Sequence, residues 1–275
     1  MQLGVRTQFL PLGKMQEVAA AARAQYASAE PFPHLVLDNL FDPEILRAII
    51  GEFPKPRDIE WTSYKNVHEV KLESNLDEHF GPVTRIMLYH MNSAPFLMFL
   101  SEITGIRGLI ADSYFDGGGM HQIERGGKLA IHADFNHHPA TQLDRRLNAL
   151  LYLNEKWHDD YGGHLELWDR TMTSCVKKIA PVFNRMVVFN TTDYTYHGHP
   201  DALTCPASTT RKSLALYYFT NGRPDEEVSG THTTLFRTRP GENLEDRYGV
   251  KIKRLAKDIL PPVLTRFVSR RIRSR

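Results

Sequence analysis

The sequence is poor in cysteine and carries little net charge, and both features limit what it can be. Only two of its 275 residues are cysteines, Cys175 and Cys205, and they form no Cys-x-x-Cys pair. A disulfide framework is therefore not indicated, and a reducing compartment, the cytoplasm, is the expected location. The formal net charge of +2 is too small to indicate a nucleic-acid partner for the whole chain.

Long apolar runs are also missing. No stretch is apolar for long enough to span a bilayer, and residues 1–14 lack the continuous apolar core of a secretory signal. Internal repeats and low-complexity linkers are absent. With 41% apolar and 24% charged residues, the chain can bury one full core, so we expect a single domain over residues 1–275.

The most informative feature that is present is the triplet His132-Ala133-Asp134. It ends a run with the character of a β-strand, and alternation places His132 and Asp134 on the same face, where one metal ion can take both. A further histidine, His197, follows a second apolar run after a turn-rich segment. Two histidines and one carboxylate are the ligand set of a non-haem iron(II) site that leaves three coordination positions open.

The segments around these residues predict short strands. They are rich in leucine, valine and aromatic residues and are bounded by Asn and Gly-Gly turn signals. The predicted strands are residues 147–154, 164–168, 184–190 and 211–219. Short strands with few helices among them favour a sandwich or jelly roll over a parallel sheet.

From about Leu109 to Thr220 the chain resembles the iron(II)- and 2-oxoglutarate-dependent dioxygenases, most closely their prolyl 4-hydroxylase-like branch. The resemblance rests on an ordered set of motifs, not on one pattern. These are Gly127 to Asp134, Leu150 to Asn154 with Trp157, Gly162 to Leu167, Asn184 to Phe189, His197, and Arg211 followed by Ser213 to Phe219. The resemblance implies a mainly β fold with helical additions (α+β), in which a double-stranded β-helix core carries an N-terminal helical cap.

The resemblance also implies a metal site and a reaction. His132, Asp134 and His197 would be the metal ligands and the catalytic centre. The cofactors would be Fe(II), 2-oxoglutarate as cosubstrate and dioxygen, with ascorbate as a candidate addition. The expected reaction is hydroxylation of an unactivated C–H bond with release of succinate and carbon dioxide.

The cosubstrate is expected to be held by a second group of side chains. Arg211 and Ser213 share one strand face, and a guanidinium forms a planar fork that matches a carboxylate. In the family this pair grips the distal carboxylate of 2-oxoglutarate. Tyr152 falls where relatives place a tyrosine on the same carboxylate, although it could equally be a half-buried strand residue. Gln122 is a further candidate, only because it precedes the His132 strand.

Among the thirteen histidines, His197 is preferred to His199 because the run from Asn184 to His197 fits the family pattern without a gap. His199 would share the strand face of His197, so it could support the ligands or face the substrate. Four other histidines lie in turn-like or alternating contexts and are expected to be solvated or structural. They are His137, His138, His158 and His164.

We assign the double-stranded β-helix core to residues 106–238. An N-terminal segment precedes it and a C-terminal segment follows it. Residues 1–105 read as helical support with a few strands. The helix signals are the alanine-rich segment 15–26, Asp42-Pro43 as a helix start, residues 82–91, and a helix from Ser93 that stops at Gly105. Residues 239–275 form a basic tail, which could contact anionic surfaces or simply be a solvated surface helix.

Two other classes of function remain open from the sequence. One is a jelly-roll module that binds a metal or ligand without turnover, and the other is a zinc hydrolase that uses the same three ligands. The substrate is not determined by the sequence. A prolyl-containing protein, a free amino acid, a sugar and a natural-product intermediate all remain candidates.

Overall fold

The computed structural model describes residues 8–242. The chain divides into two units, Met1–Pro240 and Gly241–Arg275, and nearly all described residues belong to the first. The predicted basic tail therefore lies almost entirely outside the described residues. Within the described part, no helix combines the length and apolar character that crossing a membrane would require.

Four α-helices lie in the N-terminal part of the described chain. They are α1 (Leu12–Ala27), α2 (Pro43–Glu52), α3 (Pro82–Met91) and α4 (Ala94–Thr104). The predicted helix signals are confirmed. Asp42 caps α2 by accepting a hydrogen bond from the backbone N–H of Glu44, and Pro43 stands in its first turn. Gly105 ends α4 in the left-handed conformation at φ 76°.

Thirteen strands are found in residues 8–242. They are β1 (His34–Asp38), β2 (Thr62–Lys65), β3 (Glu69–Ser74), β4 (Ile110–Ala111), β5 (Gly119–Ile123), β6 (Lys128–Ala133), β7 (Asp144–Tyr152), β8 (Leu165–Trp168), β9 (Cys175–Ile179), β10 (Arg185–Asn190), β11 (His197–His199), β12 (Arg211–Thr220) and β13 (Leu235–Phe236). Three short 3-10 helices complete the set. They are Asp77–His79, Asp159–Tyr161 and Asp225–Glu227.

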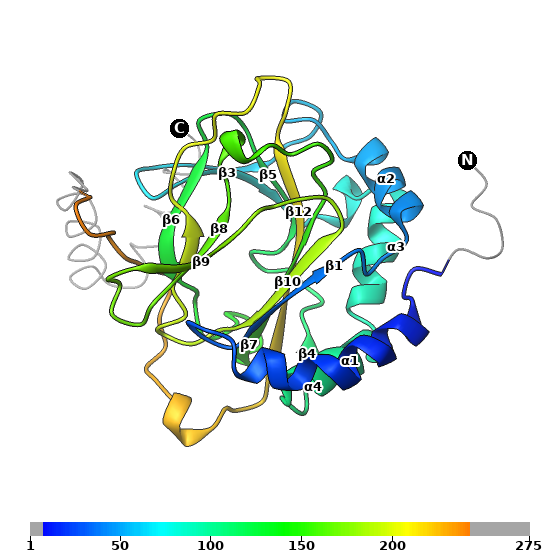
Figure 1. The fold of residues 1–275 in the computed structure, drawn as a ribbon. Helices are drawn as coiled ribbons and strands as arrows, with labels where there is room; N and C mark the ends of the chain where they lie inside the picture. The colour runs from blue at the N-terminus through cyan, green and yellow to red at the C-terminus, as the bar shows by residue number, and fades with distance from the viewer. Residues whose placement is uncertain (1–7, 243–275) are drawn as a thin grey trace, which may run out of the picture. The chain divides into compact units, whose positions relative to one another are not determined.

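The strands form one curled antiparallel sheet with the order β1-β10-β7-β12-β5-β3-β6-β11-β8-β9. Strands β2, β4 and β13 pair with β3, β12 and β6 at the sides of this path. Both ends of the path meet across an apolar layer, in which Tyr152, Val187 and Phe189 pack with Leu165 and Leu167. This is the predicted double-stranded β-helix, a mainly β fold with helical additions (Figure 1).

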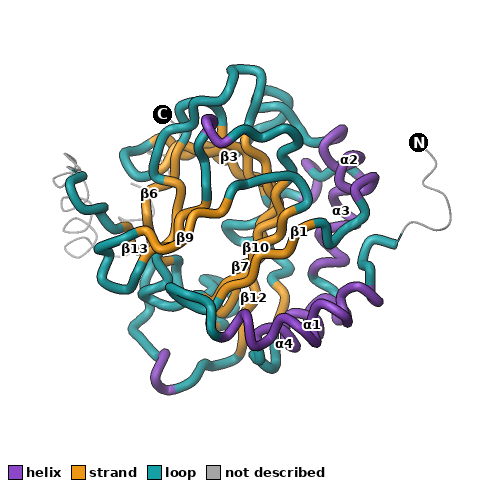
Figure 2. The backbone as a smooth tube through the Cα atoms, viewed as in Figure 1, coloured by secondary structure: helices purple, strands orange, loops and turns teal. Residues whose placement is uncertain are grey.

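The helices cover one face of the sheet (Figure 2). Their apolar side chains form the main core with alternate residues of β7, β10 and β12, such as Leu151, Val188 and Leu214. Residues between these on the same strands, including Asn148 and Tyr152, point to the opposite, inner face of the curl. The inner face of the sheet is therefore where polar side chains gather.

Strand β3 belongs to residues 1–105, for which the sequence predicts helical support with a few strands. It lies in the middle of the sheet, hydrogen-bonded to both β5 and β6. Its register pairs Glu73 with His121, and His121 pairs with Ser213 of β12. Glu73 therefore belongs to the same inner face as Ser213.

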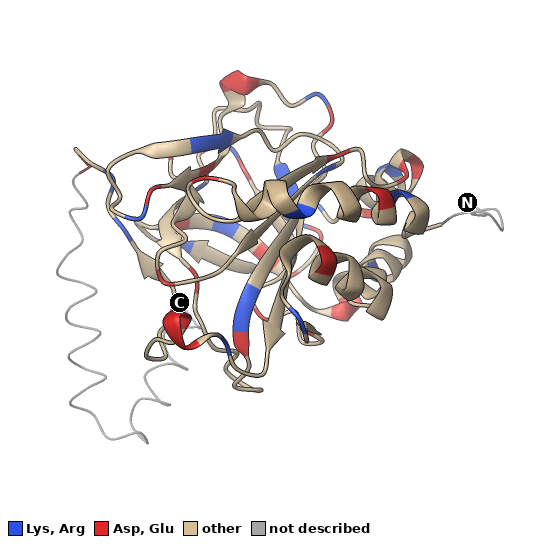
Figure 3. Cartoon of the chain, turned by 60° about the horizontal axis from the view of Figure 1, so that its bottom comes forward, with Lys and Arg blue, Asp and Glu red and all other residues tan. Residues whose placement is uncertain are grey.

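Charged residues of both signs are interspersed along the described chain (Figure 3). This distribution agrees with the small net charge of the sequence.

Candidate active site

The structure brings His132, Asp134 and His197 together. One ligand atom of each residue lies within 4.8 Å of one from each of the others, and all three residues are buried. His132 is in β6, Asp134 follows the end of that strand, and His197 opens β11 directly opposite His132. Among the described residues, this is the group of histidine, cysteine and acidic side chains whose spacing suits a metal ion.

Both histidines are held in the orientation that a metal ligand needs. The Nδ1 atom of His132 lies 2.9 Å from the carbonyl oxygen of Ala130, and the Nδ1 atom of His197 lies 2.9 Å from that of Thr195. Since a carbonyl only accepts, each Nδ1 carries the proton and each Nε2 presents a lone pair. Burial, and next the neighbouring His132, lowers the pKa of His197 to about 4, which keeps that ring in the neutral, ligating form.

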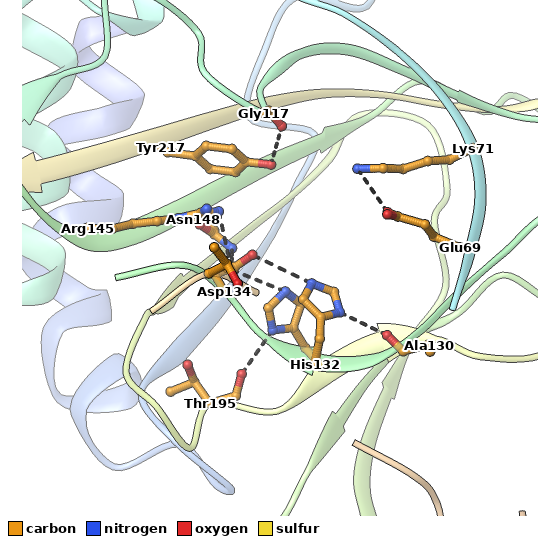
Figure 4. Close-up of polar contacts among 12 residues, drawn as sticks. Glu69, Lys71, Gly117, Ala130, His132, Asp134, Arg145, Asn148, Thr195 and Tyr217 are labelled. Atoms are coloured by element: carbon orange, nitrogen blue, oxygen red, sulfur yellow. Dashed lines mark hydrogen bonds and ion pairs between the residues drawn. The ribbon is translucent and has the colours of Figure 1, made fainter. Parts of the chain in front are cut away.

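Asp134 is held by two side chains of β7 (Figure 4). Asn148 donates from Nδ2 to Oδ2 at 2.8 Å, and an Nη atom of Arg145 lies 3.2 Å from the same oxygen. Burial alone would raise the pKa of Asp134. The positive charge of Arg145 and the interactions with His197 and His132 together outweigh burial, and the pKa is well below its ordinary value. The carboxylate is therefore ionised, as a metal ligand must be.

Arg145 is one of the most completely buried side chains of the described part, 1% exposed. Its guanidinium lies 3.5 Å from the ring centre of Tyr217 and 4.4 Å from that of Phe135. It donates through Nε and Nη2 to the side-chain oxygen of Asn148, which in turn donates to Asp134. Arg145 and Asn148 thus form one rigid support behind the carboxylate, and the sequence analysis did not identify either.

The predicted carboxylate-binding group is also assembled. Ser213 pairs with Tyr152 across β12 and β7, so both side chains and that of Arg211 lie on the inner face. Arg211 donates from Nε to the carbonyl oxygen of Gly163 at 2.8 Å and from Nη2 to the hydroxyl of Tyr152 at 3.3 Å. Burial raises the pKa of Tyr152, so its hydroxyl keeps its proton and can donate to a ligand.

Two residues near Arg211 in sequence or register point elsewhere. Lys212 pairs with Gln122 across β12 and β5, on the face opposite to Arg211. Gln122 donates from Nε2 to the carbonyl oxygen of Pro54 and accepts from the hydroxyl of Thr210. The structure thus places Gln122 apart from the Arg211 group, and we leave it out of the proposed site.

His199 lies on the inner face, two residues beyond His197. It is 4% exposed, and neither of its ring nitrogens has a hydrogen-bond partner. Burial lowers the pKa of His199 well below its ordinary value, and the positive charge of Arg211 adds to this shift, followed by His132 and Lys71. His199 is therefore a neutral imidazole among cationic or metal-binding groups.

Strand β3 adds a charged group that the sequence analysis did not identify. The Nζ atom of Lys71 lies 3.0 Å from a carboxylate oxygen of Glu73 and 3.8 Å from one of Glu69. His121 approaches Glu73 at 3.6 Å. Figure 4 shows Lys71 and Glu69 across from His132 and Asp134. The inner face thus carries fixed charges on the side facing the metal ligands.

The other histidines singled out in the sequence stay outside the metal group. His138 is 3% exposed, accepts backbone hydrogen bonds from Ala140 and Thr141, and lies 3.3 Å from Asp112. His137 and His164 lie beside Asp144 and Asp159. His158 packs on Tyr161. All four have the structural or solvated surroundings that the sequence predicted.

The residues present fit the groups that the resemblance implies. Two imidazoles with free Nε2 atoms and one ionised carboxylate suit an iron(II) ion with open coordination positions. A buried guanidinium beside a tyrosine and a serine hydroxyl suits a carboxylate.

Comparison with known proteins supports this interpretation. Residues 118–219 match the family model described as the 2OG-Fe(II) oxygenase superfamily. The match contains all three candidate metal ligands and also Tyr152, Arg211 and Ser213. Proteins of this superfamily use Fe(II), 2-oxoglutarate and dioxygen, and the match supports an oxygenase. No curated protein sequence matches the chain significantly.

Several solved structures are similar to the chain. A prolyl 4-hydroxylase from Pseudomonas putida has a TM-score of 0.54 and 18% identity, covering 74% of this chain and 100% of that one. A prolyl hydroxylase from Trichoplax adhaerens, in complex with a hypoxia-inducible factor peptide fragment, has a TM-score of 0.51 and 18% identity, covering 78% and 94%. A prolyl 4-hydroxylase structure from Phytophthora capsici has a TM-score of 0.50 and 19% identity, covering 78% and 68%. At these identities the similarity shows the fold.

Proposed function

We propose that the chain is an Fe(II)- and 2-oxoglutarate-dependent dioxygenase that hydroxylates an unactivated C–H bond. The observation that carries this proposal is the placement of two groups on one inner face of the curled sheet. His132, Asp134 and His197 form the first group, and Arg211 with its hydroxyl-bearing neighbours forms the second. A metal site alone would suit several enzyme classes, but the second group is needed only if a carboxylate-bearing cosubstrate binds beside the metal.

In this proposal, His132, Asp134 and His197 hold the iron through two Nε2 atoms and one carboxylate oxygen. When bound, iron and 2-oxoglutarate together supply the activation of dioxygen and the oxidation of the substrate, with release of succinate and carbon dioxide. Asn148 and Arg145 orient the carboxylate of Asp134 so that it does not rotate away from the metal. The backbone carbonyls of Ala130 and Thr195 keep the two imidazoles in the ligating tautomer.

Arg211, Tyr152 and Ser213 would hold the distal carboxylate of 2-oxoglutarate. The Nε atom of Arg211 is already used by Gly163, so the guanidinium presents its Nη atoms to a ligand in a fixed direction. Because Arg211 is only 5% exposed, charge-assisted hydrogen bonds there are stronger than on the surface. The protein thus contributes positioning and exclusion of water.

The first substrate class to test is a prolyl side chain in a peptide. Prolyl hydroxylases are among the solved structures with this fold, which supports the choice. Stimulation of 2-oxoglutarate turnover by proline-containing peptides, compared with free amino acids and sugars, would discriminate among the candidates. We also propose a reducing location such as the cytoplasm, since Cys175 and Cys205 are both free thiols.

The test of the proposed function compares Arg211→Ala with Lys212→Ala. The wild-type protein should convert 2-oxoglutarate to succinate only when iron(II) and dioxygen are both present. Arg211→Ala should raise the 2-oxoglutarate concentration needed for half-maximal turnover by roughly tenfold to a hundredfold, the usual effect of losing a charge-assisted contact.

Lys212→Ala is the matched control, because Lys212 points to the opposite face and donates to Thr210. It should leave the 2-oxoglutarate requirement unchanged. Equal effects of the two substitutions would refute the assignment of Arg211. Iron binding without succinate formation would indicate a binding module instead, and activity with zinc in the absence of 2-oxoglutarate would indicate a hydrolase.

A further inference from the structure

We propose that His199 is a cosubstrate-positioning residue that donates a hydrogen bond to the distal carboxylate of 2-oxoglutarate, beside Arg211. This inference rests on the proposed function. It adds to the metal ligands and the Arg211 group a residue for which the family match by itself gives no role.

The first observation is that His199 is buried without partners. Only 4% of the residue is exposed, yet neither Nδ1 nor Nε2 forms a hydrogen bond. The two candidate ligand histidines differ from it, since His132 and His197 each have Nδ1 bound to a backbone carbonyl. Burying a polar ring without partners costs stability, so a group that completes these bonds is expected in the loaded site.

The second observation is the position of His199. Alternation along β11 gives it the same face as His197, the inner face that carries the metal ligands. Strand β8 runs antiparallel beside β11, with Leu167 opposite His197 and Glu166 opposite Gly198. The next residue of β11, His199, therefore lies toward the start of β8, where the carbonyl oxygen of Gly163 accepts a hydrogen bond from Arg211. His199 thus lies on the side of the metal group that faces Arg211.

The surroundings of His199 indicate which kind of group can complete its hydrogen bonds. A neutral imidazole has one N–H donor and one acceptor nitrogen. The charged groups that act on His199 are cationic or metal-binding, so an anionic acceptor is favoured there over a further cation. If the metal ligands and Arg211 hold the two ends of 2-oxoglutarate, its distal carboxylate would be the anionic group available to His199.

The distal carboxylate has room for this donor. A carboxylate offers about four lone-pair positions on two oxygens. The Nη atoms of Arg211 and the hydroxyls of Tyr152 and Ser213 can fill part of this set. The N–H of His199 supplies a further donor from β11, on the other side of the curl from β7 and β12.

The test measures binding, not turnover, on iron(II)-loaded protein in the absence of oxygen. The variants are His199→Ala and His199→Leu, which both remove the donor, while leucine also fills the volume of the ring. Each is titrated calorimetrically with 2-oxoglutarate and with oxalate. Oxalate can chelate the metal but has no distal carboxylate, so it reports on the metal end alone.

Both variants should bind 2-oxoglutarate about tenfold more weakly than the wild type, or worse, and oxalate with unchanged affinity. Their iron content should equal that of the wild type. The inference is overturned if both variants bind 2-oxoglutarate as tightly as the wild type. It is also overturned if both ligands weaken equally, or if both variants lose iron, because His199 would then act at the metal end. A wild-type protein that binds oxalate but no 2-oxoglutarate would instead refute the proposed function.

Discussion

Each candidate metal ligand is held in place by a further group: the two histidines by backbone carbonyls two residues earlier, and Asp134 by side chains of β7. Asp134 is supported by Asn148 and Arg145, and Arg145 is itself enclosed between Phe135 and Tyr217. A buried guanidinium is costly unless it is fully paired and stacked. Its presence here therefore indicates that an ionised carboxylate is required at position 134.

Replacing Arg145 should show how far the ionised Asp134 carboxylate depends on this cation. Arg145→Leu leaves the Asp134 carboxylate buried without its cation, so the free energy of unfolding of the metal-free protein should fall by about 3 kcal/mol. Iron(II) supplies positive charge to the same carboxylate, so added metal should stabilise the variant more than the wild type. Chemical denaturation with and without iron(II), under nitrogen, measures both effects.

Arg145→Lys is the control for that experiment. It keeps the positive charge but loses the planar fork and the stacking, so a smaller loss is expected. If the metal-free Arg145→Leu protein were as stable as the wild type, the claimed support of Asp134 by Arg145 would be incorrect.

His121 gives a prediction for pH. Burial first, and then the charge of Lys71, lowers its pKa from the ordinary value of 6.5 to about 4. In the unfolded chain His121 becomes protonated below about pH 6.5, whereas in the folded chain it stays neutral until about pH 4. The free energy of unfolding should therefore fall as the pH drops through this window, by on the order of 3 kcal/mol from this residue.

The contribution of His121 can be separated from that of the other buried histidines by substitution. His121→Gln has no proton to gain, so the decline in unfolding free energy between pH 6.5 and 4 should be smaller than in the wild type. Urea denaturation at a series of pH values makes the comparison. Parallel pH profiles for the two proteins would show that His121 does not resist protonation in the fold.

Much of the site could be predicted from single residues, but its supports could not. His132 and Asp134 follow from local alternation, and His197 and Arg211 follow from the ordered motifs of the family that the chain resembles. Arg145 does not, because alternation counted back from Tyr152 points Arg146 inward instead. The register of β7 and β12 shifts between Tyr218 and Phe219, so Phe219 pairs with Arg145 and residue 146 is passed over.

At the scale of elements, the helix ends were the most predictable features. Asp42-Pro43 and Gly105 act through the backbone of their own turn, so no distant contact is needed to anticipate them. Strand β3 was the hardest element to anticipate. Its sequence Glu69-Val-Lys-Leu-Glu alternates as a strand should, but its polar side faces inward, with the Lys71 and Glu73 side chains 13% and 7% exposed. The polar face of a strand normally faces water, so the sequence pattern alone would place Lys71 and Glu73 on the outside. In this fold they line the inner face of the sheet.

The contact between β11 and β6 depends on a glycine. A Cβ atom at Gly198 would lie 2.8 Å from the backbone carbonyl oxygens of both Leu129 and Ala130. Gly198→Ala should force the two strands apart and displace His197 from His132. We expect iron(II) affinity to fall at least tenfold, as for a geometric error in a metal site, together with a loss of thermal stability.

Gly51→Ala is the matched control, since a Cβ at Gly51 in α2 would meet nothing within 4 Å. Replacing a helical glycine with alanine should raise stability by about 0.5–1 kcal/mol and leave iron affinity unchanged. Anaerobic iron titration and thermal melts of both variants make the comparison. Wild-type iron affinity in Gly198→Ala would mean that the separation of these strands does not set the metal geometry.

At the scale of the described unit, the fold separates stability from chemistry. The helices and the outer sides of β7, β10 and β12 make the main apolar core, while the inner sides of these strands carry the site. The same strand thus contributes Leu151 to the core and Tyr152 to the carboxylate group. This division explains why fold class and site could be predicted from the same strand patterns.

The central claim is that iron is held by His132, Asp134 and His197, with His199 outside the ligand set. The most direct test is anaerobic iron(II) titration of His197→Ala and His199→Ala beside the wild type. The two variants remove chemically identical side chains, both buried, two residues apart on β11. We predict one tightly bound iron per chain in the wild type and in His199→Ala, and a sharp loss of iron in His197→Ala. Iron held at wild-type strength by His197→Ala but lost from His199→Ala would contradict this account.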